Sequence, residues 1–332
     1  MASERLRVGE GAVACVVYLS WSGGVGERAR QALGPALAGV AQHVFEDAAY
    51  GRSSVTLAGG PARVSAAAAR LVRELAAQRS LREHAAQHPR VGVVDNIVLS
   101  PVEPGELAAA AAVAARLAER VAADNDWARC VLYGPAGGEL PTLAQLRRQT
   151  PYFSPSALAG PLAYDRTAEL AGLRSFGLAR ACPDKGLSFI GAVPWVVNYN
   201  VPLLPGADLA LARRVAAALR TRAGPQGLPR LEAVGLAHRD GLVEVACNLL
   251  DTAVTGPEQV QRRVQELAGP HLTGAGYVVG PPWAPLAARA RAACAAEQQQ
   301  QHGPLSRHDD FEHHPPAPTA RSPDSPDPPR DR

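Results

Sequence analysis

Short apolar runs alternate with amphipathic, alanine-rich stretches along most of the chain. An apolar run of strand length bounded by turn residues predicts a β-strand, and apolar residues at helical spacing predict an α-helix. In the first half we predict strands at Ala14–Leu19, Val44–Asp47, Ser54–Ala58, Val91–Leu99 and Arg129–Tyr133, and helices at Glu27–Val40, Ala62–Ala77 and Glu106–Ala123. The pattern therefore indicates a protein that contains both kinds of element.

The same alternation restarts after a loop-rich stretch, Pro151–Gly186. In the second half we predict strands at Val193–Val201, Leu231–His238, Leu242–Leu249 and Gly276–Val279, and helices at Asp208–Arg222, Gln259–Leu267 and Ala284–Ala296. The Asp240-Gly241 pair is typical of a hairpin turn. This βαββαβ order is that of a ferredoxin-like unit, and the first half is a longer version of it. We therefore expect an α+β fold of two ferredoxin-like α/β subdomains.

The composition indicates a folded chain of about two domains with a disordered tail. A length of 332 residues suggests two domains, and 47% hydrophobic against 20% charged residues excludes a wholly disordered chain. From Pro304 onward the sequence is rich in proline and nearly free of aliphatic side chains. Such a segment cannot offset the entropy of ordering, so we predict a disordered Pro-rich tail over residues 301–332.

Charge and cysteine content exclude several functions. The net charge is +3, and no basic stripe is interleaved with aromatic residues, so we expect no nucleic-acid partner. No apolar run reaches the roughly 18 residues of a membrane span, and the N-terminus lacks a secretory signal. The five cysteines are far apart without a Cys-x-x-Cys pair, which predicts neither a zinc site nor a disulfide framework. We expect a cytoplasmic protein that binds no membrane.

Two histidines, His84 and His88, come just before the predicted strand at Val91. An imidazole on a loop that enters a sheet is a natural general acid and base near neutral pH. A surface pair of histidines is the commoner explanation for the spacing alone. Pro89 disfavours a helix at His88, and this argues against a metal pair on one helix face.

Two carboxylates stand at unusual places in the strand pattern. Asp47 ends one predicted strand, and Asp95 interrupts another. A carboxylate at such a place faces solvent, a cleft or a partner. Ser20, His88 and Asp47 together would suit a hydrolase, but no Gly-x-Ser-x-Gly motif frames any serine.

The segment Phe176–Gly186 is rich in turn residues. It could wrap an anionic ligand, with Arg180 and Lys185 as the donors. An interdomain linker explains the same composition equally well.

Several blocks of sequence resemble one known family. They are His88–Val102, Val131–Gly134, Phe176–Asn200 and Val243–Asp251, and they occur in the family's order at close to its spacing. From about Cys15 to Leu286 the chain is similar to the formiminotransferase domain, the folate-dependent half of formiminotransferase-cyclodeaminase. We expect a short, stand-alone member that lacks the cyclodeaminase half.

The resemblance implies an architecture and a reaction. Two subdomains, residues 1–180 and 181–300, would face each other with their sheets, with helices outside and a folate channel between. The family moves a formimino group from N-formiminoglutamate to N5 of tetrahydrofolate. Its partners would be the folate co-substrate and a glutamate-derived molecule, and the chemistry asks for no metal. The family often pairs its subunits, and the apolar helix faces here would permit a homodimer.

The resemblance also assigns residues. The family's catalytic histidine falls on His88, and Asp47 and Arg52 fall near its substrate-binding residues. The folate-contacting loop falls on Gly177, Leu178, Ala179, Arg180, Ala181, Cys182, Pro183, Asp184, Lys185 and Gly186. Arg52, Arg180 and Lys185 would suit the carboxylates of glutamate or of the folate tail.

The chain departs from the family at four polar positions. Tyr18 replaces an Asn and Trp21 a Glu in the N-terminal motif, Gly51 replaces an Asn, and Pro135 a Glu. Losing polar groups in one cleft weakens transition-state hydrogen bonding. One alternative is therefore a catalytically inactive member that binds a folate or a protein partner. Another is a scaffold whose channel is filled by Tyr18 and Trp21.

Overall fold

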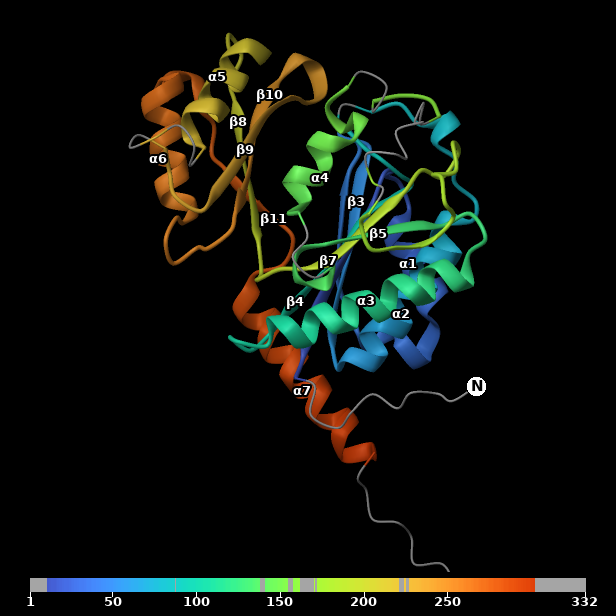
Figure 1. Ribbon diagram of the computed structural model, residues 1–332. Coiled ribbons are helices and arrows are strands. Elements are labelled where there is room, and N and C mark those ends of the chain that lie inside the picture. The colour runs from blue at the N-terminus through green and yellow to red at the C-terminus, as the bar shows by residue number, and fades with distance from the viewer. Residues whose placement is uncertain are drawn as a thin grey trace, which may run out of the picture.

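Two β-sheets with helices packed against them make up the described part of the computed structural model of the protein (Figure 1). It describes residues 11–301 except 87, 138–140, 155–157, 162–169, 171, 221–223 and 225–226. The predicted tail therefore lies outside the described residues, apart from Gln301 at the end of the last helix. Among the helices that are described, none combines the length and apolarity that a membrane span needs.

The first sheet has seven strands in the order β2-β3-β1-β4-β7-β5-β6. Its first βαββαβ unit consists of β1 (Val13–Leu19), α1 (Val25–Ala38), β2 (Ala41–Asp47), β3 (Arg52–Gly59), α2 (Pro61–Ala76) and β4 (Val94–Pro101). These four strands pair antiparallel in the ferredoxin-like order β2-β3-β1-β4. The sheet continues through β5 (Arg129–Tyr133), β6 (Ser175–Gly177) and β7 (Ser188–Ala192), with β7 parallel to β4 and β5.

The second sheet has four antiparallel strands in the order β11-β8-β10-β9. In chain order its elements are β8 (Val197–Leu203), α5 (Leu209–Leu219), β9 (Leu231–Ala237), β10 (Val243–Leu249), α6 (Pro257–Ala268) and β11 (Tyr277–Val279). Both the chain order and the strand order are ferredoxin-like. The prediction of an α+β fold with two such units is therefore confirmed.

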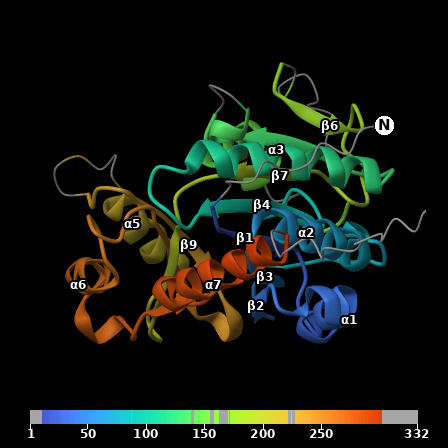
Figure 2. The ribbon, with the colours of Figure 1, turned by 90° about the horizontal axis from the view of Figure 1, so that it is seen from below.

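Successive side chains of a strand point to opposite faces of its sheet. In β1, Cys15, Val17 and Leu19 pack into the core beneath α1, α2 and α3 (Leu107–Asp124), which cover one face of the first sheet (Figure 2). In β8, Tyr199 and Val201 pack beneath α5 and α6. The remaining faces, here called the inner faces, meet through side-chain contacts between the two sheets.

The structure corrects the prediction near the middle of the chain. The predicted strand Val193–Val201 overlaps only β8, which begins at Val197, and its first four residues connect the two sheets. Strand β7, which ends at Ala192, was not predicted. Pro194 lies between β7 and β8 and cannot donate to a strand ladder. The short helix α4 (Leu143–Gln149) and strand β6 were not predicted.

The two sheets do not divide at the predicted boundary. We predicted units of residues 1–180 and 181–300, but β7 lies beyond residue 180 and pairs with β4 and β5. The last helix, α7 (Trp283–Gln301), also returns to the first sheet, where Leu286 and Ala290 pack with Ala14 and Ala58.

The chain thus passes between the sheets twice in the described residues, after β7 and after β11. Trp195 on the first passage stacks against Trp283 at the second, with ring centroids 4.9 Å apart.

Candidate active site

The Asp95 carboxylate lies at an irregularity of β4. Strand β1 pairs Tyr18 with Asn96 and Leu19 with Val94, so Asp95 between them has no partner on β1. A β-bulge of this kind re-aims a side chain. Asp95 is fully buried, and a charged group tolerates burial only with partners.

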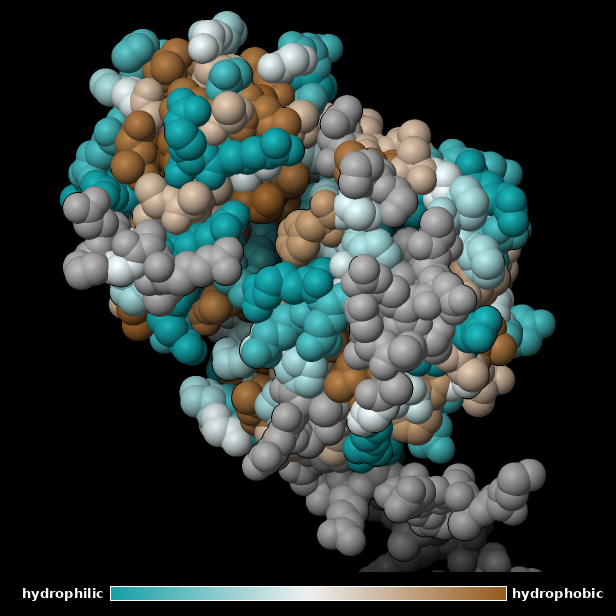
Figure 3. Space-filling model, turned by 45° about the horizontal axis from the view of Figure 1, so that its top comes forward, coloured by the Kyte–Doolittle hydropathy of each residue, from teal (hydrophilic) through white to brown (hydrophobic). Residues whose placement is uncertain are grey.

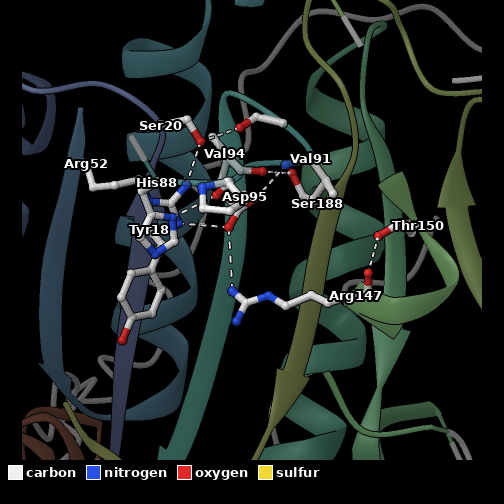
Figure 4. A network of polar contacts seen from close by, with 12 residues as sticks. Tyr18, Ser20, Arg52, His88, Val91, Val94, Asp95, Arg147, Thr150 and Ser188 are labelled. Carbon is white, nitrogen blue, oxygen red and sulfur yellow. Dashed lines mark hydrogen bonds and ion pairs between the residues drawn. The ribbon is translucent and has the colours of Figure 1, made fainter. Parts of the chain in front are cut away.

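Two guanidinium groups supply those partners. Asp95 Oδ2 accepts a hydrogen bond from Arg52 Nη2 at 2.8 Å and lies 3.6 Å from Arg147 Nη2, while Oδ1 accepts from the Val91 N–H at 2.8 Å (Figure 4). Burial alone would raise the pKa of Asp95, but the two cations and the Val91 amide hold it below its ordinary value. Asp95 is therefore an ionised carboxylate that holds both arginines.

Arg52 is fixed from two sides. In addition to its bond with Asp95, its Nη1 donates to Ser20 Oγ at 2.8 Å, and the Ser20 hydroxyl donates to the Gly92 carbonyl at 2.6 Å. Only 8% of Arg52 is exposed. Both terminal nitrogens of Arg52 are thus committed to protein partners.

The His88 ring lies beside these charges, between the rings of Tyr50 and Tyr152 at centroid distances of 5.8 and 6.4 Å. Its Nδ1 is 2.7 Å from the Pro89 carbonyl oxygen. Because a carbonyl only accepts, Nδ1 carries the proton and Nε2 keeps its lone pair. Burial and the nearby Arg52 cation lower the pKa of His88 to about 3. His88 is therefore a neutral imidazole, and we call Ser20, Arg52, His88, Asp95 and Arg147 the Asp95 cluster.

His84 has a different role from His88. Arg90 Nε donates to His84 Nδ1 at 2.7 Å, so His84 Nε2 carries the proton and donates to the Gly51 carbonyl at 3.3 Å. Burial lowers the pKa of His84 to about 4. Gly51 has φ of +56°, and an added Cβ would lie 2.7 Å from Ala86 Cβ. His84 thus fixes the loop that holds Gly51, and both of its ring nitrogens are occupied.

The second sheet contributes a buried carboxylate to the inner faces. Glu244 is 3% exposed, and its Oε2 accepts from the Tyr50 hydroxyl at 2.8 Å and from Asn200 Nδ2 at 3.2 Å. The Tyr277 hydroxyl lies 3.1 Å from both carboxylate oxygens. Tyr50 therefore links the loop before β3 to β10, and its ring also contacts His88.

A hydroxyl and two amides form another contact between the sheets. Tyr18 donates from its hydroxyl to Asn198 Oδ1 at 3.2 Å, and Asn198 Nδ2 donates to Asn248 Oδ1 at 2.6 Å. Figure 3 shows a hollow between the two lobes with hydrophilic side chains at its margin. The inner faces thus form a polar lining around the Asp95 cluster.

A family model described as the formiminotransferase domain, N-terminal subdomain, matches residues 12–193 of this chain. The chain belongs to the formiminotransferase family. It is 32% identical over 273 residues to a formiminotransferase cyclodeaminase-like protein of Arabidopsis thaliana, a match that covers 79% of this chain and 91% of that protein. The resemblance read from the sequence is therefore confirmed.

More distant similarities are also present. The chain is 26% identical over 227 residues to formimidoyltransferase-cyclodeaminase of Rattus norvegicus, which covers 65% of this chain and 40% of the rat protein. A solved structure of a microcompartments protein from Desulfitobacterium hafniense DCB matches 82% of this chain and 96% of that chain at 14% identity. Its TM-score of 0.19 supports no argument about fold or function.

Of the substrate-binding pair that the formiminotransferase resemblance assigns, Arg52 lies in the Asp95 cluster and Asp47 lies apart from it. Asp47 Oδ2 is 3.2 Å from Nε2 of His238 on the hairpin of the second sheet. Its Oδ1 accepts from the Tyr50 N–H at 2.9 Å. Both oxygens of Asp47 are occupied, and they join the Tyr50 loop to the second sheet.

The loop at Gly177–Gly186 also has protein partners. Lys185 Nζ donates to the carbonyls of Ala76, Ala77 and Arg79 at 2.7, 2.8 and 2.6 Å. These carbonyls lie at and just after the C-terminal end of α2, where a cation is favourable. The structure therefore places the Lys185 ammonium at the helix side of the sheet and not in the Asp95 cluster.

Trp21 does not lie between the sheets. It is 6% exposed and packs in the helix-side core, with the Arg79 guanidinium 5.5 Å from its ring. Tyr18 does lie on the inner face. The reading in which Tyr18 and Trp21 together fill the channel is thus wrong for Trp21, which belongs to the opposite face of the first sheet.

Arg147 and Tyr152 lie at the site although no motif in the sequence marks them. Arg147 lies on α4, whose start carries a capping box formed by Thr142 and Gln145. A threonine followed three residues later by glutamine, with Leu143 and Leu146 between and after them, was the available signal for this helix. Among the described residues no group of three or more His, Cys, Asp or Glu side chains could hold a metal ion.

Proposed function

We propose that this protein transfers a formimino group from an N-formiminoglutamate-type donor to N5 of tetrahydrofolate, with His88 as general acid and base. Family membership supports the reaction class. The observation that carries the residue assignment is the His88 imidazole, which is neutral, held in one tautomer by Pro89, and next to two arginines.

The proposed reaction needs one proton to move between two nitrogens. N5 of tetrahydrofolate attacks the amidine carbon of the donor and forms a carbon–nitrogen bond. His88 Nε2 takes the proton that N5 loses, and returns it to the glutamate nitrogen as the bond from carbon to that nitrogen breaks. The products are 5-formiminotetrahydrofolate and glutamate. Tetrahydrofolate is thus the co-substrate.

Binding of the anionic donor would also change the pKa of His88. A base with a pKa of about 3 is weak. Burial is the main cause of this low pKa, and the nearby Arg52 and Arg147 cations lower it further. An anionic donor bound near these arginines offsets their charge and raises the pKa of His88. His88 therefore becomes a stronger base when the donor is present.

The variant His88→Ala tests the assignment. General acid–base catalysis contributes about 10²- to 10⁴-fold, so we expect a loss of kcat in this range. The readout is methenyltetrahydrofolate absorbance after acid treatment of the product, with thermal unfolding as a check of folding. The matched control is His271→Ala, which removes an exposed imidazole. A folded His88→Ala protein that keeps full turnover would refute the role of His88.

A second candidate function is folate binding without transfer. It is favoured by the contact between Tyr18 and Asn198, which spans the inner faces where the family has a smaller asparagine. Calorimetric titration with folinate, a stable reduced folate, separates the two. Binding without turnover supports this second candidate, and binding with turnover supports the transferase.

A further inference from the structure

Arg147 extends from α4 toward the Asp95 carboxylate (Figure 4). Its helix is anchored by Leu146, which is fully buried, and by the capping box at its start. The Arg147 guanidinium carbon lies 4.5 Å from the centroid of the Tyr152 ring, so the aromatic face supports the cation. In Figure 1, α4 stands between the two lobes. Arg147 is therefore a positioned cation on a helix that stands between the two lobes.

The donors of Arg147 are less occupied than those of Arg52. Its Nη2 is 3.6 Å from Asp95 Oδ2, which is an ion pair beyond hydrogen-bond distance. Its Nε is buried and has no hydrogen-bond partner among the described residues. Arg52 places both terminal nitrogens in bonds of 2.8 Å. A buried donor without a partner is costly, and a ligand oxygen would relieve that cost.

The charges around Arg147 are not balanced, and the excess is positive. Arg52 and Arg147 share a single carboxylate, Asp95. Across the inner faces, Glu232 is the acid that acts on Arg147. It accepts from Asn248 Nδ2 at 3.3 Å, and no ion pair within 4.0 Å joins it to Arg147 in the described part of the chain. The Asp95 cluster thus carries more positive than negative charge.

We propose that Arg147 is the carboxylate-binding residue of this site and takes a glutamyl carboxylate in the fork of its guanidinium. The glutamyl group comes from the one-carbon donor or from the tail of the folate. These two sources rest on the proposed function, whereas the carboxylate site itself rests on the contacts of Arg147. The planar guanidinium suits a carboxylate because two parallel N–H donors match its two oxygens.

The test compares Arg147→Gln with Arg148→Gln, an exposed arginine next along the same helix. Calorimetry measures the binding of glutarate, of L-glutamate and of folinate to each full-length protein. We expect Arg147→Gln to weaken carboxylate binding about ten- to a hundred-fold, as loss of a charge-assisted hydrogen bond does. Arg148→Gln should bind like the unchanged protein. Arg147→Lys keeps the charge without the fork and should fall between them.

The two sources give different results. Weaker binding of glutamate and glutarate with unchanged folinate affinity assigns Arg147 to the donor, and the reverse assigns it to the folate tail. Equal binding by Arg147→Gln and the unchanged protein, or no carboxylate binding by the unchanged protein, overturns the proposal. If the unchanged protein binds carboxylate through Arg147 but transfers nothing, the proposed function fails and the carboxylate site stands.

Discussion

The two sheets share a topology but present different chemistry on their inner faces. Both contain a βαββαβ unit with the same strand order. The first sheet pairs its buried carboxylate, Asp95, with two guanidiniums. The second surrounds Glu244 with two tyrosine hydroxyls and an amide, and none of the ion pairs among the described residues includes it. The same fold can therefore place reactive charge on one sheet and neutral hydrogen-bond donors on the other.

The difference has a cause in the strands themselves. Asp95 reaches its cations because a bulge removes it from the regular alternation of β4. Glu244 lies in a regular register opposite Pro202 and Leu236. An irregular strand thus builds the charged site, and a regular strand builds the lining.

Asp95→Asn should have the largest effect, because it leaves two arginines without their shared counter-charge. Breaking a buried pair by removing one partner costs about 3–5 kcal/mol, so we expect a loss of this size in the free energy of unfolding. Urea denaturation measures it. The control is Asp124→Asn, which removes a surface pair with Arg120 and should cost less than about 1 kcal/mol. Equal losses in the two variants would contradict a special role for Asp95.

Acid should destabilise the first sheet over a defined range. His84 and His88 have pKa values of about 4 and about 3 in the folded protein, against an ordinary 6.5. The unfolded chain therefore binds more protons below pH 6.5, and stability falls as the pH drops from there toward 4, and toward 3 for His88. Urea midpoints measured across this range test the effect.

The variant His88→Gln assigns part of that acid sensitivity. Glutamine cannot take up a proton in either state, so the midpoints of this variant should change less with pH than those of the unchanged protein. His271→Gln, at an exposed position, serves as the control. If the urea midpoints of His88→Gln and of the unchanged protein changed with pH in parallel, His88 would not be buried as a neutral group.

Glu244→Gln should cost less than the matching change at Asp95. No guanidinium loses its partner, and the hydroxyls of Tyr50 and Tyr277 can turn to accept instead of donate. We expect a loss of about 1–2 kcal/mol from the weaker hydrogen bonds. Chemical denaturation of both variants under one set of conditions compares their losses in the free energy of unfolding. A larger loss for Glu244→Gln than for Asp95→Asn would reverse the comparison between the two sheets.

Tyr18→Phe should have the smallest effect. It removes one hydroxyl that bonds Asn198 across the inner faces and keeps the ring. A single neutral hydrogen bond contributes about 0.5–1.5 kcal/mol. Thermal unfolding measures this loss, and folinate titration shows whether the contact also affects ligand entry. A loss well above this range would mean that Tyr18 supports more than one contact.

The sequence predicts the elements better than it predicts the contacts between them. Apolar runs of strand length locate β1, β9 and β10, and β10 also alternates, with Val245 and Cys247 in the core and Glu244 on the opposite face. The same pattern does not identify β7 as a separate strand, because its apolar run Ser188–Ala192 is followed closely by β8. Nothing local in the sequence shows that consecutive apolar runs enter different sheets.

The candidate site is predicted in part. The His-Pro-Arg motif and the resemblance identify His88, and the interrupted strand identifies Asp95. Arg147 is not found, because its partner Asp95 is distant in the chain and α4 is only 7 residues long. Lys185 suits an anion by its charge, but its position at the end of α2 depends on tertiary packing.

The two segments that connect the lobes meet where Trp195 and Trp283 stack. Trp195 and Trp283 lie on the two passages, so a rotation of one lobe against the other would use this stack as a pivot. Asn198 follows the pivot closely along β8, whereas Glu244 pairs with Pro202 near the far end of the strand. In such a rotation the Tyr50–Glu244 contact would be displaced more than the Tyr18–Asn198 contact, because it lies further along β8 from the tryptophan stack. The larger displacement would then fall on Tyr50, the residue whose ring touches His88.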